Sequence, residues 1–151
     1  MNVRFKYLLL VVSLLMPLSV FGAEGLIALK SSHSVSATAD KLTTLLKDKG
    51  MTVMNRISHS DGAASVDLEL RATELVIFGN PKVGTPLMQC AQSVAIDLPQ
   101  KALIWEDESG QVWLGYNDPM YLKQRHGIEG CDAVLGKIAG ALDNFATAAT
   151  R

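Results

Sequence analysis

A strand, a turn and the start of a helix follow one another in residues 75–86, LVIFGNPKVGTP. The first four residues are a continuous apolar run that Gly79 ends, which is typical of a central strand buried on both faces. The rest of the segment is dense in turn formers. Thr85 as N-cap and Pro86 at the first helical position predict a helix that continues to about Ser93.

Strands and helices are also predicted on both sides of this segment. Ser34 is a good N-cap, and the apolar residues behind it recur at helical spacing. Two short apolar runs joined by a turn with Ser109-Gly110 predict an antiparallel hairpin. In chain order, we expect strands at 26–29 and 52–57 with a helix at 35–49 between them, a short helix within 59–70, hairpin strands at 102–105 and 112–116, a helix from Asp118 to Gly127, and a last helix that buries Cys131, Val134, Leu135, Ile138, Leu142 and Phe145. This mixture predicts a two-layer α+β domain.

Length and charge exclude one broad class of function. The chain has 151 residues, of which 48% are hydrophobic and 19% charged, enough for one domain with a buried core. Lys and Arg number 14 against 15 Asp and Glu, which gives a formal net charge of −1. Proteins that bind nucleic acid by neutralising phosphates carry an excess of basic residues. We therefore expect no nucleic-acid partner.

The first 22 residues are typical of a cleavable secretory signal. Arg4 and Lys6 form a short positive region, residues 7–21 are apolar, and Gly22 and Ala23 are small. The apolar run is shorter than the roughly 20 residues of a membrane-spanning helix. We expect cleavage after Gly22 or Ala23, with an uncleaved N-terminal anchor as the alternative. The product would be one exported, periplasmic domain, free of the membrane, and the loss of two basic residues would lower its formal net charge from −1 to −3.

Export changes the interpretation of the two cysteines, Cys90 and Cys131. In an oxidising compartment two cysteines often pair, and these two are too far apart in sequence for a Cys-x-x-Cys redox motif. We therefore favour a structural disulfide. Two separately buried thiols and one reactive thiol are the alternatives.

Residues 78–89, FGNPKVGTPLMQ, are similar to the signature of the bacterial and archaeal family called domain of unknown function 302. The resemblance covers residues 25–146, nearly the whole chain after the signal. It departs from the family at Gly115, where a small polar residue, usually Ser, is expected. Further motifs match on both sides: His59 with Gly62-Ala63-Ala64, Asp97-Leu98-Pro99, Trp105-Glu106-Asp107, Val112-Trp113, Tyr116-Asn117-Asp118-Pro119, Tyr121-Leu122 and Arg125-His126.

The resemblance implies an architecture and no activity. The expected fold is an α+β two-layer sandwich with a curved, mainly antiparallel sheet and helices on one face, similar to the topology of the TATA-box-binding protein. Association with a second copy, as a homodimer, is a further expectation from the resemblance. No activity of the family can be carried over, so function has to be argued from the residues.

Polar residues at the ends of the predicted elements form the candidate site. Element interiors are committed to packing, whereas at element ends side chains from distant segments can meet in one cleft. We expect them to form a pocket for a small polar or anionic ligand, to which the helix N-terminus at Pro86 adds positive potential. For each residue the alternative is a structural role in a turn or cap. The candidate ligand-binding residues are His59, Asn80, Lys82, Gln89, Asn117, Arg125 and His126.

These residues favour a binding or interaction module without catalysis. The motifs are rich in Asn, Gln, Pro and Trp, which position and stack, and poor in groups that titrate near neutral pH. One alternative is a small periplasmic enzyme with His59 or His126 as general base and Glu106 as partner. Another is a haem or copper protein in which these histidines converge with Cys90 or Met88. No His-x-x-x-His or Cys-x-x-Cys motif occurs, so we expect no metal site of local spacing and name no cofactor.

The secretory signal gives the first testable prediction. Protein recovered from the periplasm should lack residues 1–22 or 1–23, because the charged, apolar and small segments follow the order that signal peptidase requires. Intact-mass spectrometry distinguishes the two cleavage positions. A chain that still begins at Met1 would contradict the prediction.

Overall fold

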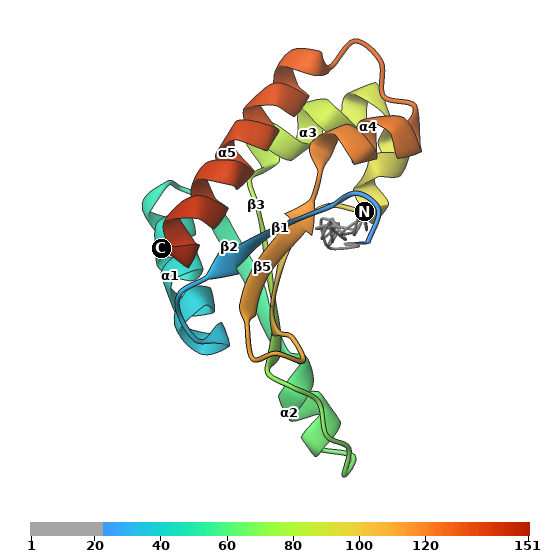
Figure 1. Cartoon of the computed structure of the whole chain (residues 1–151). Coiled ribbons are helices and arrows are strands. Elements are labelled where there is room, and N and C mark those ends of the chain that lie inside the picture. The colour runs from blue at the N-terminus through green and yellow to red at the C-terminus, as the bar shows by residue number, and fades with distance from the viewer. Residues whose placement is uncertain (1–22) are drawn as a thin grey trace, which may run out of the picture.

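The computed structural model describes residues 23–151, and its centre is one five-stranded sheet (Figure 1). The predicted secretory signal, residues 1–22, lies outside the described residues. The strands are β1 (Leu26–Ser31), β2 (Thr52–Ser58), β3 (Thr73–Gly79), β4 (Gln100–Glu106) and β5 (Val112–Asn117). Their order across the sheet is β1-β5-β4-β3-β2, and each neighbouring pair is antiparallel.

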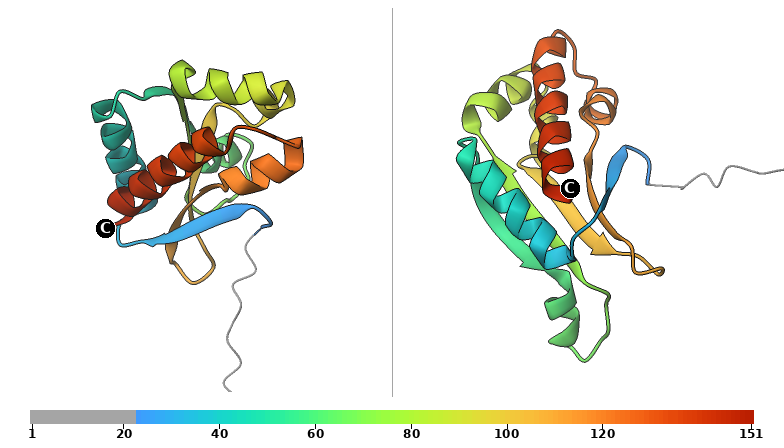
Figure 2. Two further views of the ribbon diagram at one scale, coloured as in Figure 1. Left: turned by 90° about the horizontal axis from the view of Figure 1, so that it is seen from above. Right: turned by 60° about the vertical axis from the view of Figure 1, so that its left-hand side comes forward.

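Helices cover one face of this sheet and both of its ends. They are α1 (Val35–Asp48), α2 (His59–Ala64), α3 (Pro81–Cys90), the short 3₁₀ helix η1 (Gln92–Ile96), α4 (Pro119–His126) and α5 (Asp132–Thr150). α1 and α5 pack on the sheet, α3 and α4 lie beyond one end, and α2 lies beyond the other (Figures 1 and 2). The predicted α+β fold with helices on one face is confirmed. Within residues 23–151, no helix combines the length and the apolar character needed to cross a bilayer.

α1 forms as the sequence predicts. The Ser34 hydroxyl oxygen accepts a hydrogen bond from the Ala37 N–H at 3.2 Å, which caps the helix. After the helix, Gly50 takes a φ of 72°, a left-handed conformation that glycine adopts without strain. One face is buried against the sheet and α5, and consists of Val35, Thr38, Ala39, Leu42 and Leu46.

Side chains of the central strands alternate between a buried and a half-buried face. Val76 and Phe78 of β3 point toward the helices and are fully buried. Leu75 and Ile77 point to the other face and remain half-buried. The prediction that this strand is buried on both faces is therefore wrong, because the helices of the described part of the chain cover the antiparallel sheet on one side only.

α3 begins about one turn earlier than predicted. Asn80 is its N-cap, with the side-chain oxygen accepting from the Lys82 N–H at 2.9 Å, and Pro81 takes the first helical position. Pro86 lies inside the helix, which ends at Cys90. The expected helix N-terminus at Pro86 is thus wrong, because Asn80-Pro81 offers the same cap-and-proline start one turn earlier.

The hairpin of β4 and β5 is held by its aromatic pair and by its turn. Trp105 and Trp113 face each other across the strands with ring centroids 6.4 Å apart and planes at 18°. In the turn, Asp107 accepts hydrogen bonds from the Ser109 hydroxyl at 2.6 Å and from the Trp113 indole N–H at 2.7 Å. These hydrogen bonds, of which the one from Ser109 has the largest effect, hold the pKa of Asp107 well below its ordinary value. Asp107 is therefore a structural turn residue.

The hairpin also explains why Gly115 departs from the small polar residue that the family resemblance leads us to expect. A Cβ at this position would lie 3.0 Å from the Trp105 ring and 3.2 Å from Leu26. Glycine lets the indole lie directly over the β5 backbone. A serine here would require the Trp105 ring to shift by a few tenths of an ångström.

Candidate functional site

The structure places the predicted site residues at opposite ends of the sheet. His59 follows β2 at one end, and Asn80 follows β3 at the other. The register pairs Ser58 with Glu74 and Thr52 with Gly79, which separates the two positions by roughly 20 Å of strand. His126 ends α4 on the side of Asn80. The prediction of one cleft shared by His59, Asn80 and His126 is therefore wrong.

Asn80 and three further candidates are dispersed as well. Asn80 is committed to capping α3, and its Nδ2 lies 3.5 Å from the Gly50 carbonyl oxygen, to which it donates. Lys82 and Gln89 lie on the exposed surface of α3. Asn117 ends β5, where it pairs with Leu26 of β1. Of these four, Asn80 lines the apolar pocket described below, and the other three do not line it.

Arg125 and His126 do come together, around Asp97. His126 Nε2 lies 2.6 Å from Asp97 Oδ2, and Arg125 donates to the other carboxylate oxygen at 3.3 Å. His126 Nδ1 lies 3.1 Å from the Ser93 hydroxyl oxygen. The His126 side chain is only 7% exposed. These contacts fasten η1 and the residue after it to the C-terminal end of α4.

The predicted haem or copper site does not form from the residues proposed for it. His59 and His126 lie at opposite ends of the domain, and the Cys90 sulfur is bonded to Cys131. Across residues 23–151, no three His, Cys, Asp or Glu side chains gather in a way that could hold a metal ion. Glu106, the proposed partner of a general base, ends β4 away from His126.

The more apolar of two concave features in the described residues is a pocket of about 330 Å³. It lies between α3 and α5, over the end of the sheet where β3 ends and β4 begins. Methionine and phenylalanine side chains supply much of its wall, and Lys137 is an exposed charged residue that lines it. Its principal apolar residues are Met51, Met54, Phe78, Met88, Leu142 and Phe145. This lining favours an apolar ligand over the polar or anionic one that we predicted.

One polar side chain is buried in this pocket. Gln100 opens β4 directly opposite Phe78 of β3 and is 8% exposed. Its Nε2 is buried and has no hydrogen-bond partner within the described part of the chain. The pocket is thus an apolar space with one unsatisfied amide donor in its wall.

Sequence reasoning missed Gln100, although a signal for it exists. Gln100 lies two residues before Ala102 and four before Ile104, so it shares their buried face. A polar residue in phase with buried strand positions is a candidate for a site. The predicted strand began at Ala102, so Gln100 was not recognised as a residue of its buried face.

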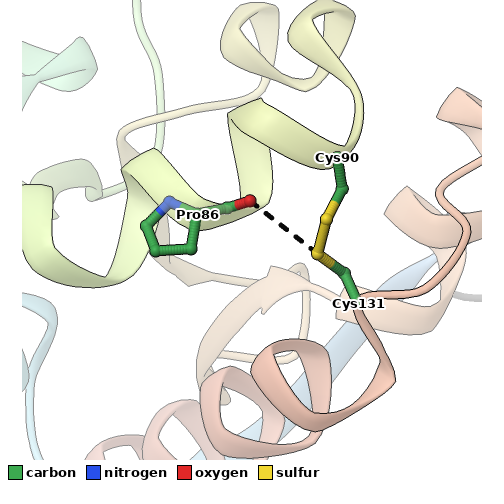
Figure 3. Close-up of a disulfide and its surroundings, with 3 residues drawn as sticks. All are labelled: Pro86, Cys90 and Cys131. Carbon is green, nitrogen blue, oxygen red and sulfur yellow. Dashed lines mark hydrogen bonds between the residues drawn. A yellow bond between two sulfur atoms is a disulfide. The ribbon is translucent and has the colours of Figure 1, made fainter.

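The predicted disulfide between Cys90 and Cys131 is confirmed, and it joins the two helices that form the walls of the pocket (Figure 3). Cys90 is the last residue of α3, Cys131 is the N-cap of α5, and their Cα atoms are 6.4 Å apart. The Cys131 sulfur also lies 3.7 Å from the Pro86 carbonyl oxygen. A disulfide sulfur carries no hydrogen, so this last approach is a packing contact.

Comparison with known proteins identifies the domain type. The family described as "Domain of unknown function DUF302" matches residues 27–145. The crystal structure of the uncharacterised conserved protein DUF302 from Bacillus stearothermophilus superposes with a TM-score of 0.75 over 85% of this chain and 100% of that chain. Sequence identity with it is 18%, so this likeness concerns the fold.

Curated relatives match over part of their length. Fluoride-specific ion channel FluC 1 of Brucella suis is 46% identical over 112 residues, which are 74% of this chain and 44% of that protein. FluC 1 of Brucella abortus and FluC 2 of Brucella melitensis show the same identity over 42% of their lengths. The chain thus spans less than half the length of these relatives.

The disulfide gives the second prediction. Replacing both cysteines, Cys90→Ser with Cys131→Ser, should lower the free energy of unfolding by about 3–5 kcal/mol, because the bond closes a loop of 41 residues in the unfolded chain. Urea denaturation of the oxidised protein and of the double variant measures the difference. Reducing agent should destabilise the wild type and leave the double variant unchanged. Two free thiols in the unfolded, unreduced wild type would contradict the bond.

Proposed function

This chain belongs to the family described as domain of unknown function DUF302, and we propose that it is an exported, non-catalytic module that binds one small apolar molecule between α3 and α5. The observation that carries this proposal is the apolar pocket of about 330 Å³. Small-molecule sites are clefts of roughly 300–1,000 Å³ with mostly apolar walls and few polar groups. The pocket has the size and the lining of such a site.

The walls of the pocket can adapt to ligands of different shapes. Met51, Met54 and Met88 contribute flexible, polarisable side chains that adapt to irregular surfaces. Phe78 and Leu142 lie behind them and are almost completely buried, so the floor is fixed by the core. An adaptable rim over a fixed floor favours a compact apolar molecule.

Export is part of the proposal and has two supports. The first 22 residues have the order of a secretory signal, and a disulfide persists in an oxidising compartment such as the periplasm. Because the chain covers less than half of the FluC relatives, fluoride conduction is not part of the proposal.

A second candidate function is hydrolysis, and one observation favours it. Ser93, His126 and Asp97 follow one another in the order of nucleophile, base and orienting carboxylate, at 3.1 Å and 2.6 Å. Ser93 does not line the apolar pocket, and Arg125 shares the carboxylate of Asp97. We therefore assign these residues to fastening η1 against α4.

The third prediction tests the pocket. Ala141→Phe places a ring in the pocket and should weaken naphthalene binding at least roughly tenfold, because the ring and the ligand would occupy the same space. Isothermal titration calorimetry measures the affinity. Ala148→Phe is the matched control, since Ala148 is exposed on the same helix and does not line the pocket. Absent binding by the wild type, or equal weakening by both variants, would refute the proposal.

The fourth prediction separates binding from hydrolysis. Purified protein should hydrolyse p-nitrophenyl acetate no faster than its Ser93→Ala variant, since the Ser93–His126–Asp97 contacts are structural. Release of p-nitrophenol followed by absorbance is the measurement. A burst that Ser93→Ala and His126→Ala both abolish, while the variants stay folded, would establish the catalytic alternative.

A further inference from the structure

We infer that Gln100 selects ligands that carry a neutral hydrogen-bond acceptor, such as a ring nitrogen or a carbonyl oxygen, on an otherwise apolar body. This inference rests on the proposed function, because it concerns the same pocket. It adds the chemical class of the ligand and the residue that recognises it.

The Gln100 amide is buried without a hydrogen-bond partner for its donor. The side chain is 8% exposed, and its buried Nε2 lacks a partner among the described residues. A buried donor that has left water without a new partner costs free energy. A ligand that accepts a hydrogen bond from Nε2 recovers this cost, whereas a pure hydrocarbon does not.

The pocket residues discussed below do not give Gln100 Nε2 a hydrogen-bond partner. Phe78, opposite Gln100 in the sheet, supplies an aromatic ring to the pocket. Asn80 also lines the pocket, but both ends of its amide are engaged, with the Lys82 N–H and the Gly50 carbonyl oxygen. Thr43, the other residue with a buried unpartnered polar atom in residues 23–151, does not line the pocket. Nε2 itself has almost no accessible surface, and Gln100 lines the pocket, so a rotation of the amide about its terminal torsion presents the donor to the bound molecule.

The surroundings of Gln100 favour a ligand without charge at the acceptor. An ionised carboxylate buried beside a neutral amide and apolar walls would lose its hydration without a compensating charge. Lys137 is the charged residue that lines the pocket, and it is exposed to solvent. The acceptor that meets Gln100 is therefore neutral.

The volume of the pocket limits the size of the ligand. At about 330 Å³ the pocket lies at the lower end of the range of small-molecule sites, roughly 300–1,000 Å³, so it takes a compact ligand such as a fused two-ring aromatic compound. Naphthalene and quinoline both have this size and nearly the same shape. Quinoline differs in one ring nitrogen, which accepts a hydrogen bond, so this pair isolates the contribution of the acceptor.

The experiment measures both affinities by isothermal titration calorimetry at a pH where quinoline is uncharged. The wild type should bind quinoline roughly two- to tenfold more tightly than naphthalene, the range that one neutral hydrogen bond supplies. Gln100→Met should lose this preference and keep its affinity for naphthalene. Gln89→Met is the matched control, because Gln89 lies exposed on α3 outside the pocket, and it should keep the preference.

A second measurement needs no variant. In the wild type, the side-chain amide resonances of Gln100 should shift when quinoline is added and stay nearly unchanged with naphthalene. If neither compound binds, the proposed function itself fails. If both bind equally well, or if Gln100→Met keeps the preference, the pocket stands and the role of Gln100 is refuted.

Discussion

Among residues 23–151, helices cover only one face of the sheet, and this asymmetry governs the rest of the described structure. Strand residues that point to the helices, such as Val76 and Ile104, are fully buried, whereas their neighbours on the other face are half-buried. α1 and α5 lie along the covered face, while α3 passes beyond the end of the strands. The pocket lies where α3, α5 and that end of the sheet meet. Two layers that do not overlap completely leave such a space, and the apolar side chains already committed to the core line it.

The sequence predicted the elements whose signals are local. Ser34 identified the start of α1, Ser109-Gly110 the hairpin, and Asp118 with Gly127 both ends of α4. The start of α3 was missed because Asn80-Pro81 and Thr85-Pro86 carry the same cap-and-proline signal, and tertiary packing chooses between them. The long-range pairing of Cys90 with Cys131 was predicted from the expected oxidising compartment, since the sequence contains no other cysteine.

The candidate site was harder to predict, for a geometric reason. Element ends occur at both ends of a sheet, and only the register of β2 with β3 shows that His59 and Asn80 lie at different ones. Gln100 illustrates the converse. Its phase with Ala102 and Ile104 is visible in the sequence, but the absence of a partner for its amide depends on which helices pack above it. Periodicity thus indicates which face a residue occupies, and the surroundings on that face follow only from the assembled fold.

The covalent link between α3 and α5 explains how an apolar pocket and an unpartnered amide can persist together. A space between two helices can close if they move toward each other, and closure would return dispersion contacts to its walls. Cys90 and Cys131 fix the distance between the neighbouring ends of these helices, with their Cα atoms 6.4 Å apart, and Pro81 and Pro86 restrict the backbone of α3. Under the proposed function, the ligand would meet these helices in an arrangement that folding has already set, and little ordering would accompany binding. Folding would then also have met the cost of burying the Gln100 amide, so an acceptor on the ligand would gain from pairing with it.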